Sequence, residues 1–193
     1  MYKFNLTLFV ALLFSFCTKA QNSPTISSVK FGDLKLLFPI DSVNKYLDNK
    51  ITLTQLKGEN TSVSDTVYTT YKGFTVRLVI NSYLDYMSTK LTTELASIYC
   101  DDSKIKTKSG IKIGDNKYDL IKKLEGSYLT INPNPDKRKG YSIVSLYDGT
   151  SGFQLIFYFK DNVLYAIECD SQEFFGCSKF IDNPVIFNQM DNC

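Results

Sequence analysis

One pattern of glycine, alternating apolar residues and cysteine occurs twice in this chain, once on each side of residue 100. Residues 73–80 align without a gap on residues 152–159, and residues 95–100 align on residues 164–169. In the first pair of segments, apolar residues recur at every second position, as the buried face of an antiparallel strand requires. The duplication therefore predicts two similar units, each with about three or four antiparallel strands.

The alternation gives each of these strands two faces. One face is predicted to lie in the core and carries eight apolar side chains: Phe74, Val76, Leu78, Ile80, Phe153, Leu155, Phe157 and Phe159. The other face carries Arg77, Ile156 and Tyr158, which are residue types found at protein interfaces. We therefore predict these three residues, with Tyr86 in the adjoining loop, as partner-binding residues. Packing of Ile156 and Tyr158 against the other unit or the C-terminal tail is the alternative.

A short helix is predicted ahead of the strands in each unit. Residues 116–124 place Leu120, Ile121 and Leu124 on one helical face, and Asp115 stands where it could cap the first turn. In the first unit, a helix fits residues 42–47. The predicted order in each unit is therefore loop, helix and then strands.

Residues 107–126 carry three glycines, Gly110, Gly114 and Gly126, spaced by aliphatic and polar residues. This segment resembles the signature at the head of beta-lactamase inhibitor protein-like (BLIP-like) units, and it is similar to that of the SmpA/OmlA outer-membrane assembly lipoproteins. The resemblance implies an α+β fold of two tandem units, each a helix-loop-helix packed on a roughly four-stranded antiparallel sheet. The first, divergent unit would span residues 21–103 and the second residues 104–170. No partner-binding residue is carried over from these families.

The first twenty residues are typical of a secretory signal peptide. A positive start is followed by an apolar stretch over residues 4–16, and Thr18 and Ala20 are small residues at the positions a signal peptidase recognises. We therefore predict cleavage near Ala20 and a periplasmic or secreted protein. Lipidation at Cys17 is the alternative, although the preceding Phe16 is larger than such a signal normally has. No later segment is apolar enough to span a bilayer.

Four cysteines remain after the predicted cleavage. An even number in an oxidising compartment indicates two disulfides, and four cysteines allow three connectivities. We favour Cys169 with Cys177 and, by elimination, Cys100 with Cys193, so that residues 171–193 form a disulfide-linked tail. A metal site is not predicted, because the chain has no histidine and no Cys-x-x-Cys pair.

The composition argues against several classes of function. The absence of histidine removes the usual general base and the common nucleophile arrangements. Ser109 beside Lys108 or Lys112 is the remaining hydrolase arrangement, supported only by proximity in sequence. After cleavage the chain carries 20 basic and 20 acidic groups, so nucleic-acid binding is not expected. We predict neither catalytic residues nor a cofactor.

These observations favour a non-catalytic protein-binding module of the periplasm or the extracellular space, such as an inhibitor of a hydrolase. Its partner would be another protein of the envelope or the medium. The alternative is a cell-envelope structural or assembly factor resembling the SmpA/OmlA lipoproteins. Acylated Cys17 would favour that alternative, whereas an N-terminus at Gln21 would favour the binding module.

Overall fold

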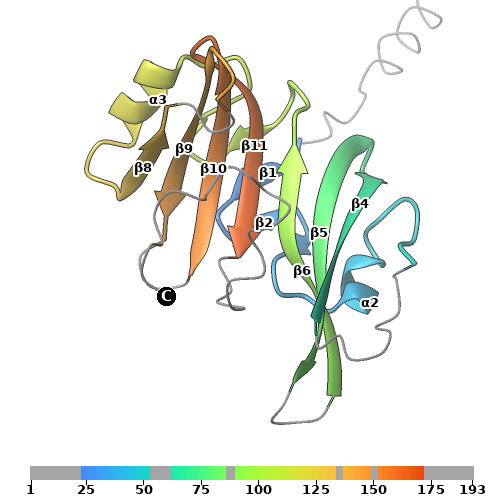
Figure 1. Cartoon of the computed structure of the whole chain (residues 1–193). Helices are drawn as coiled ribbons and strands as arrows, with labels where there is room; N and C mark the ends of the chain where they lie inside the picture. The colour runs from blue at the N-terminus through green and yellow to red at the C-terminus, as the bar shows by residue number, and fades with distance from the viewer. Residues whose placement is uncertain (1–22, 53–61, 86–89, 134–136, 149–151, 172–193) are drawn as a thin grey trace, which may run out of the picture.

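Seven antiparallel strands from both halves of the chain form one continuous sheet in the computed structural model (Figure 1). The structure describes residues 23–52, 62–85, 90–133, 137–148 and 152–171. The strands of the large sheet are β4 (Ser62–Tyr71), β5 (Phe74–Asp85), β6 (Lys90–Cys100), β8 (Leu129–Asn132), β9 (Tyr141–Tyr147), β10 (Phe153–Lys160) and β11 (Val163–Ser171). Their order across the sheet is β4-β5-β6-β11-β10-β9-β8.

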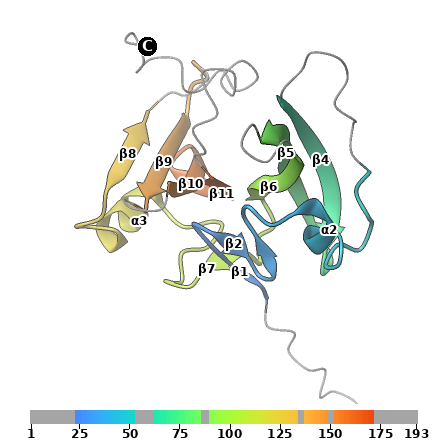
Figure 2. The same cartoon turned by 90° about the horizontal axis from the view of Figure 1, so that it is seen from below.

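A second, smaller layer covers one side of this sheet. It contains the short strands β1 (Thr25–Ser27), β2 (Lys30–Phe31), β3 (Leu34–Lys35) and β7 (Lys106–Thr107), and the helices α2 (Ile40–Val43) and α3 (Lys117–Lys123). The small sheet has the order β3-β2-β1-β7, with β1 and β7 parallel. Figure 2 shows the small sheet below the middle of the large one, with a helix toward either side. We name the covered side of the large sheet its inner face and the opposite side its outer face.

The hydrophobic core lies between the inner face and the smaller layer. Seven of the eight predicted core side chains are buried, which confirms the prediction for them. The eighth, Phe153, is partly buried and packs against the same cluster. The smaller layer contributes Ile26, Phe31 and Leu34, and α3 contributes Leu120, each of them 0% exposed. The period-two alternation thus identified the buried face of β5 and β10.

The duplicated segments occupy equivalent places in the sheet. Residues 73–80 and 152–159 fall on β5 and β10, while residues 95–100 and 164–169 fall on β6 and β11. The two copies meet where β6 pairs with β11, with Cys100 opposite Ile167 and Cys169 opposite Ile98. The alignment of the two copies matches Cys100 with Cys169 and Ile98 with Ile167. The two pairs are therefore equivalent, and the β6–β11 junction is locally symmetric. The two sequence units therefore share a single sheet.

The predicted fold of helix-loop-helix units was wrong, because strands dominate and the described residues contain only two helices, of four and seven residues. In the first unit, Gly32 adopts a φ of +58°, and the chain turns there from β2 into β3. Its neighbours Phe31 and Leu34 then face each other as buried strand residues. Glycine adopts this left-handed conformation at little cost, so the segment forms a hairpin.

The two helices lie close to their predicted positions. The predicted helix over residues 42–47 is α2, which begins earlier and already ends at Val43. The predicted helix over residues 116–124 is confirmed as α3. Its cap is Asn116, whose side chain accepts a hydrogen bond from the Tyr118 amide, whereas Asp115 accepts one from the Lys112 amide. Each unit thus keeps one helix that packs against the core.

Candidate binding surfaces

A buried carboxylate, Glu168, lies at the centre of the outer face. The Arg77 guanidinium donates from Nη2 to Glu168 Oε2 at 3.3 Å, and the Tyr158 hydroxyl donates to the same oxygen. The Ser97 hydroxyl donates to the other oxygen, Oε1. The Glu168 side chain is only 8% exposed, and a carboxylate removed from water needs such partners. Strands β5, β6 and β10 each supply one donor to this carboxylate on β11.

A row of four tyrosines, Tyr99, Tyr158, Tyr165 and Tyr141, crosses the outer face beside this carboxylate. Consecutive ring centroids lie 5.7, 6.3 and 6.0 Å apart, within the range of favourable aromatic pairs. The Arg77 guanidinium lies over the Tyr99 ring at 4.3 Å. A register shift between β10 and β11 brings Tyr165 beside Tyr158. We call these four residues the tyrosine row.

The hydroxyls of Tyr99 and Tyr158 remain protonated at neutral pH. Burial, followed by the charge of Glu168, raises the pKa of Tyr158 well above its ordinary value. Burial also raises the pKa of Tyr99, and the charge of Asp101 acts in the same direction. Neither residue therefore supplies a nucleophilic phenolate at neutral pH.

Three of the four predicted partner-binding residues meet on the outer face. Arg77 and Tyr158 contact Glu168, and Ile156 lies directly opposite Glu168 across the β10–β11 pair. Ile156 is only 9% exposed. The fourth, Tyr86, lies outside the described residues. Sequence reasoning missed Glu168 itself, although its position in the repeat, between two buried residues of β11, was a usable signal.

A second surface lies at the end of the hairpin formed by β5 and β6. The ends of β5 and β6 at this hairpin extend past the rest of the sheet at the bottom of Figure 1. Leu84 and Leu91 lie opposite each other there and are 38% and 57% exposed. Closer to the sheet, Ser82 and Thr93 share a hydrogen bond of 3.1 Å, and the Tyr83 hydroxyl donates to Glu94. We call Leu84 and Leu91 the hairpin tip.

The described cysteines lie on the inner face. Cys100 and Cys169 are 0% exposed, and neither forms a disulfide with another described cysteine. Burial raises the pKa of Cys100 to about 11 and raises that of Cys169 well above its ordinary value. Their predicted partners, Cys177 and Cys193, lie outside the described residues, so both disulfides stay predictions. Among the residues with described positions, no three His, Cys, Asp or Glu side chains gather where they could hold a metal ion.

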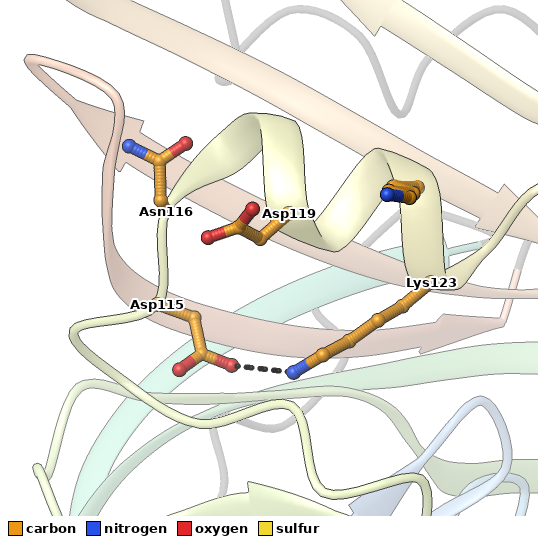
Figure 3. Close-up of a pocket in the computed structure, with 5 residues that line it drawn as sticks. Asp115, Asn116, Asp119 and Lys123 are labelled. Atoms are coloured by element: carbon orange, nitrogen blue, oxygen red, sulfur yellow. Dashed lines mark ion pairs between the residues drawn. The ribbon is translucent and has the colours of Figure 1, made fainter.

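A shallow pocket lies at the start of α3 (Figure 3), and local contacts explain the polar residues that line it. It is lined by Asp115, Asn116, Asp119, Lys122 and Lys123. Asp115 pairs with Lys123 at 3.6 Å and also accepts the Lys112 amide, while Asn116 caps the helix. The Ser109 hydroxyl, considered above as a hydrolase nucleophile, shares a hydrogen bond with that of Thr107. The polar contacts in this region stabilise a turn and a helix.

Comparison with known protein families, with curated proteins and with solved structures finds no match to this chain. The resemblance to BLIP-like units therefore stays a prediction. No helix in the described part of the chain is both long enough and apolar enough to span a membrane.

Proposed function

We propose that this chain is a periplasmic or secreted protein that binds another protein without catalysis, and that the hairpin tip makes the first contact. The observation that carries the proposal is the exposed Leu84–Leu91 pair at the end of a projecting hairpin. These two side chains continue the inner-face row of β5 and β6 past the end of the core. Apolar side chains gathered in this way are typical of a surface that another protein covers.

The base of the hairpin is held in one conformation before any partner arrives. The Ser82–Thr93 and Tyr83–Glu94 hydrogen bonds link its two strands, and Asn81 pairs with Glu94 in the same register. An ordered hairpin loses less conformational entropy on binding than a free loop does. This supports a role for the tip as a preformed contact for an apolar groove on an envelope or extracellular protein.

The experiment compares the mature protein with a Leu84→Ser/Leu91→Ser variant and a Tyr128→Ser control. Tyr128 is 79% exposed and lies before β8, in the other half of the sheet. Each protein is used to capture partners from the envelope and medium of the native cell. The recovered partner is then purified, and its dissociation constant with each protein is measured by calorimetry.

We expect the wild type and the Tyr128→Ser control to bind the same partner and the double variant to lose it. The free energy of unfolding of the double variant should stay within about 0.5 kcal/mol of the wild type, as is usual for exposed substitutions. Equal affinity of all three proteins would show that the tip is not the contact. Recovery only of acylated protein with membrane fractions would instead favour an envelope assembly factor.

A further inference from the structure

The centre of the outer face is buried, whereas its edges are exposed. Ile143 and Ile156 are 7% and 9% exposed, yet neither belongs to the core cluster on the inner face. On the edge strands of the same face, Tyr68 is 71% exposed and Thr130 is also exposed. The helices and the small sheet lie on the opposite side (Figure 2). Burial is therefore confined to the centre of the outer face. We infer that a segment of limited size packs over Ile143 and Ile156.

Two buried hydrogen-bond donors on β5 have no acceptor among the described residues, one at Arg77 beside Glu168 and one at Asn81, four positions further along the strand. Arg77 Nε and Asn81 Nδ2 are both buried and find no acceptor within the described part of the chain. Asn81 is 4% exposed, and its side-chain oxygen already accepts a hydrogen bond from Ser64 at 2.8 Å. A buried donor without an acceptor destabilises the folded state, because it has given up its hydrogen bonds to water. We therefore expect the covering segment to bring acceptors as well as apolar side chains.

The chain itself carries a segment with this chemistry, residues 172–193. It follows directly from Ser171 at the end of β11, which lies between β6 and β10 in the middle of the sheet. Fully extended, 22 residues span about 70 Å, and seven strands are only about 29 Å across. Its large apolar residues are Phe174, Phe175, Phe180, Ile181, Val185, Ile186, Phe187 and Met190. Acceptors are available from Glu173, Asp182 and Asp191.

We propose that residues 172–193 dock on the outer face of the large sheet. Their apolar side chains would cover Ile143, Ile156 and the tyrosine row. Their acceptors would take hydrogen bonds from Arg77 Nε and Asn81 Nδ2. A tethered segment acts at an effective concentration in the millimolar range when the tether is short. It therefore competes well against a second copy of the chain or a separate partner. This docking leaves the hairpin tip free and does not depend on the function proposed for it.

The test uses the full mature chain with a single fluorescent reporter. The protein contains no tryptophan, so Phe180→Trp gives one tryptophan signal from the C-terminal segment. Acrylamide quenching measures how far the reporter is shielded from solvent. The reporter chain is combined with Ile156→Ser at the centre of the outer face, with Arg77→Met as a second variant, and with Tyr68→Ser at the exposed edge as the control. Circular dichroism checks that each variant is folded.

We expect the reporter to be shielded in the parent chain and in the Tyr68→Ser control, at every protein concentration. Shielding should be lost in whichever of the Ile156→Ser and Arg77→Met variants remains folded. A freely quenched reporter in the parent chain would overturn the proposal, as would equal shielding in both folded variants. Shielding that disappears on dilution would assign the face to a second copy.

Discussion

Arg77 on β5 and Glu168 on β11 form an ion pair across β6, the strand that lies between them, with 3.3 Å between Nη2 and Oε2. The two residues are 91 positions apart and belong to different copies of the repeat. The pair therefore links the two halves of the sheet on its outer face. It adds to the β6–β11 backbone pairing, which covers only residues Ser97–Cys100 of β6.

Replacing Glu168 with glutamine should destabilise the protein by about 1–3 kcal/mol, because the buried carboxylate that Arg77, Ser97 and Tyr158 all donate to is lost. Urea unfolding of Glu168→Gln, Arg77→Met and the double variant measures the effect. The double variant should lose less than the sum of the two single losses, since each single change already breaks the pair.

The matched control for this prediction is the pair of Asp115 and Lys123. It has a separation of 3.6 Å, and the Lys123 side chain is 51% exposed. Lys123→Met should change the free energy of unfolding by less than about 1 kcal/mol, as exposed ion pairs do. If Glu168→Gln costs no more than this control, the outer-face pair contributes little to the stability of the sheet.

Gly32→Ala should destabilise the protein far more than Gly73→Ala. Both glycines have a positive φ, +58° and +79°, so each substitution carries a backbone cost of about 1–2 kcal/mol. A Cβ at Gly73 would meet open space, whereas a Cβ at Gly32 would collide with the hydroxyl of the buried Tyr71. Thermal unfolding of the two variants separates the steric cost from the backbone cost. Equal losses would mean that Tyr71 can move aside.

The stability contributed by Asp33 should depend on pH. Hydrogen bonds from Lys72 Nζ at 2.6 Å and from the Tyr71 hydroxyl at 3.1 Å hold the pKa of Asp33 below its ordinary value. A carboxylate with a lowered folded pKa stabilises the fold above the unfolded pKa, about 3.9 for aspartate, and loses this effect as the pH falls through the folded pKa. Asp33→Asn should therefore lower the melting temperature at pH 7 by more than at pH 2. The effect should be small, because Asp33 is half exposed.

A constant difference between Asp33→Asn and the wild type across this pH range would contradict the electrostatic explanation. It would show that the asparagine disturbs the β2–β3 turn in some other way. The Lys72→Met variant provides a second check, because removing the lysine should weaken the same pH dependence while leaving the hydrogen bond from Tyr71 intact.

The strands that carry the repeat were predictable from sequence, whereas their union in one seven-stranded sheet and the smaller layer were not. Strands β5 and β10 are long enough for the alternation from Phe74 to Ile80 and from Phe153 to Phe159 to show a period of two. Strands β2 and β3 have two residues each, so no periodicity can appear in them. Their pairing depends on the turn at Gly32 and on burial of Phe31 against a distant part of the chain.

The period-two alternation also predicted part of the outer face. Alternation alone placed Arg77, Ile156 and Tyr158 on the side away from the core. It could not show that they surround Glu168, because that contact depends on which strands are neighbours and in which register. It also could not place Tyr165, whose contact with Tyr158 follows from the register shift between β10 and β11.

Cys100 and Cys169 should resist alkylation in the native protein and react only after unfolding. Both side chains are 0% exposed on the inner face. With a pKa of about 11 for Cys100, only about one thiol in a thousand is ionised at pH 8, and the thiolate is the reactive form. Peptide mapping after iodoacetamide treatment, with and without urea, measures the labelling of each cysteine. Failure of urea alone to expose them, with labelling only after reduction, would contradict free thiols. It would favour the predicted pairing of Cys169 with Cys177 and Cys100 with Cys193.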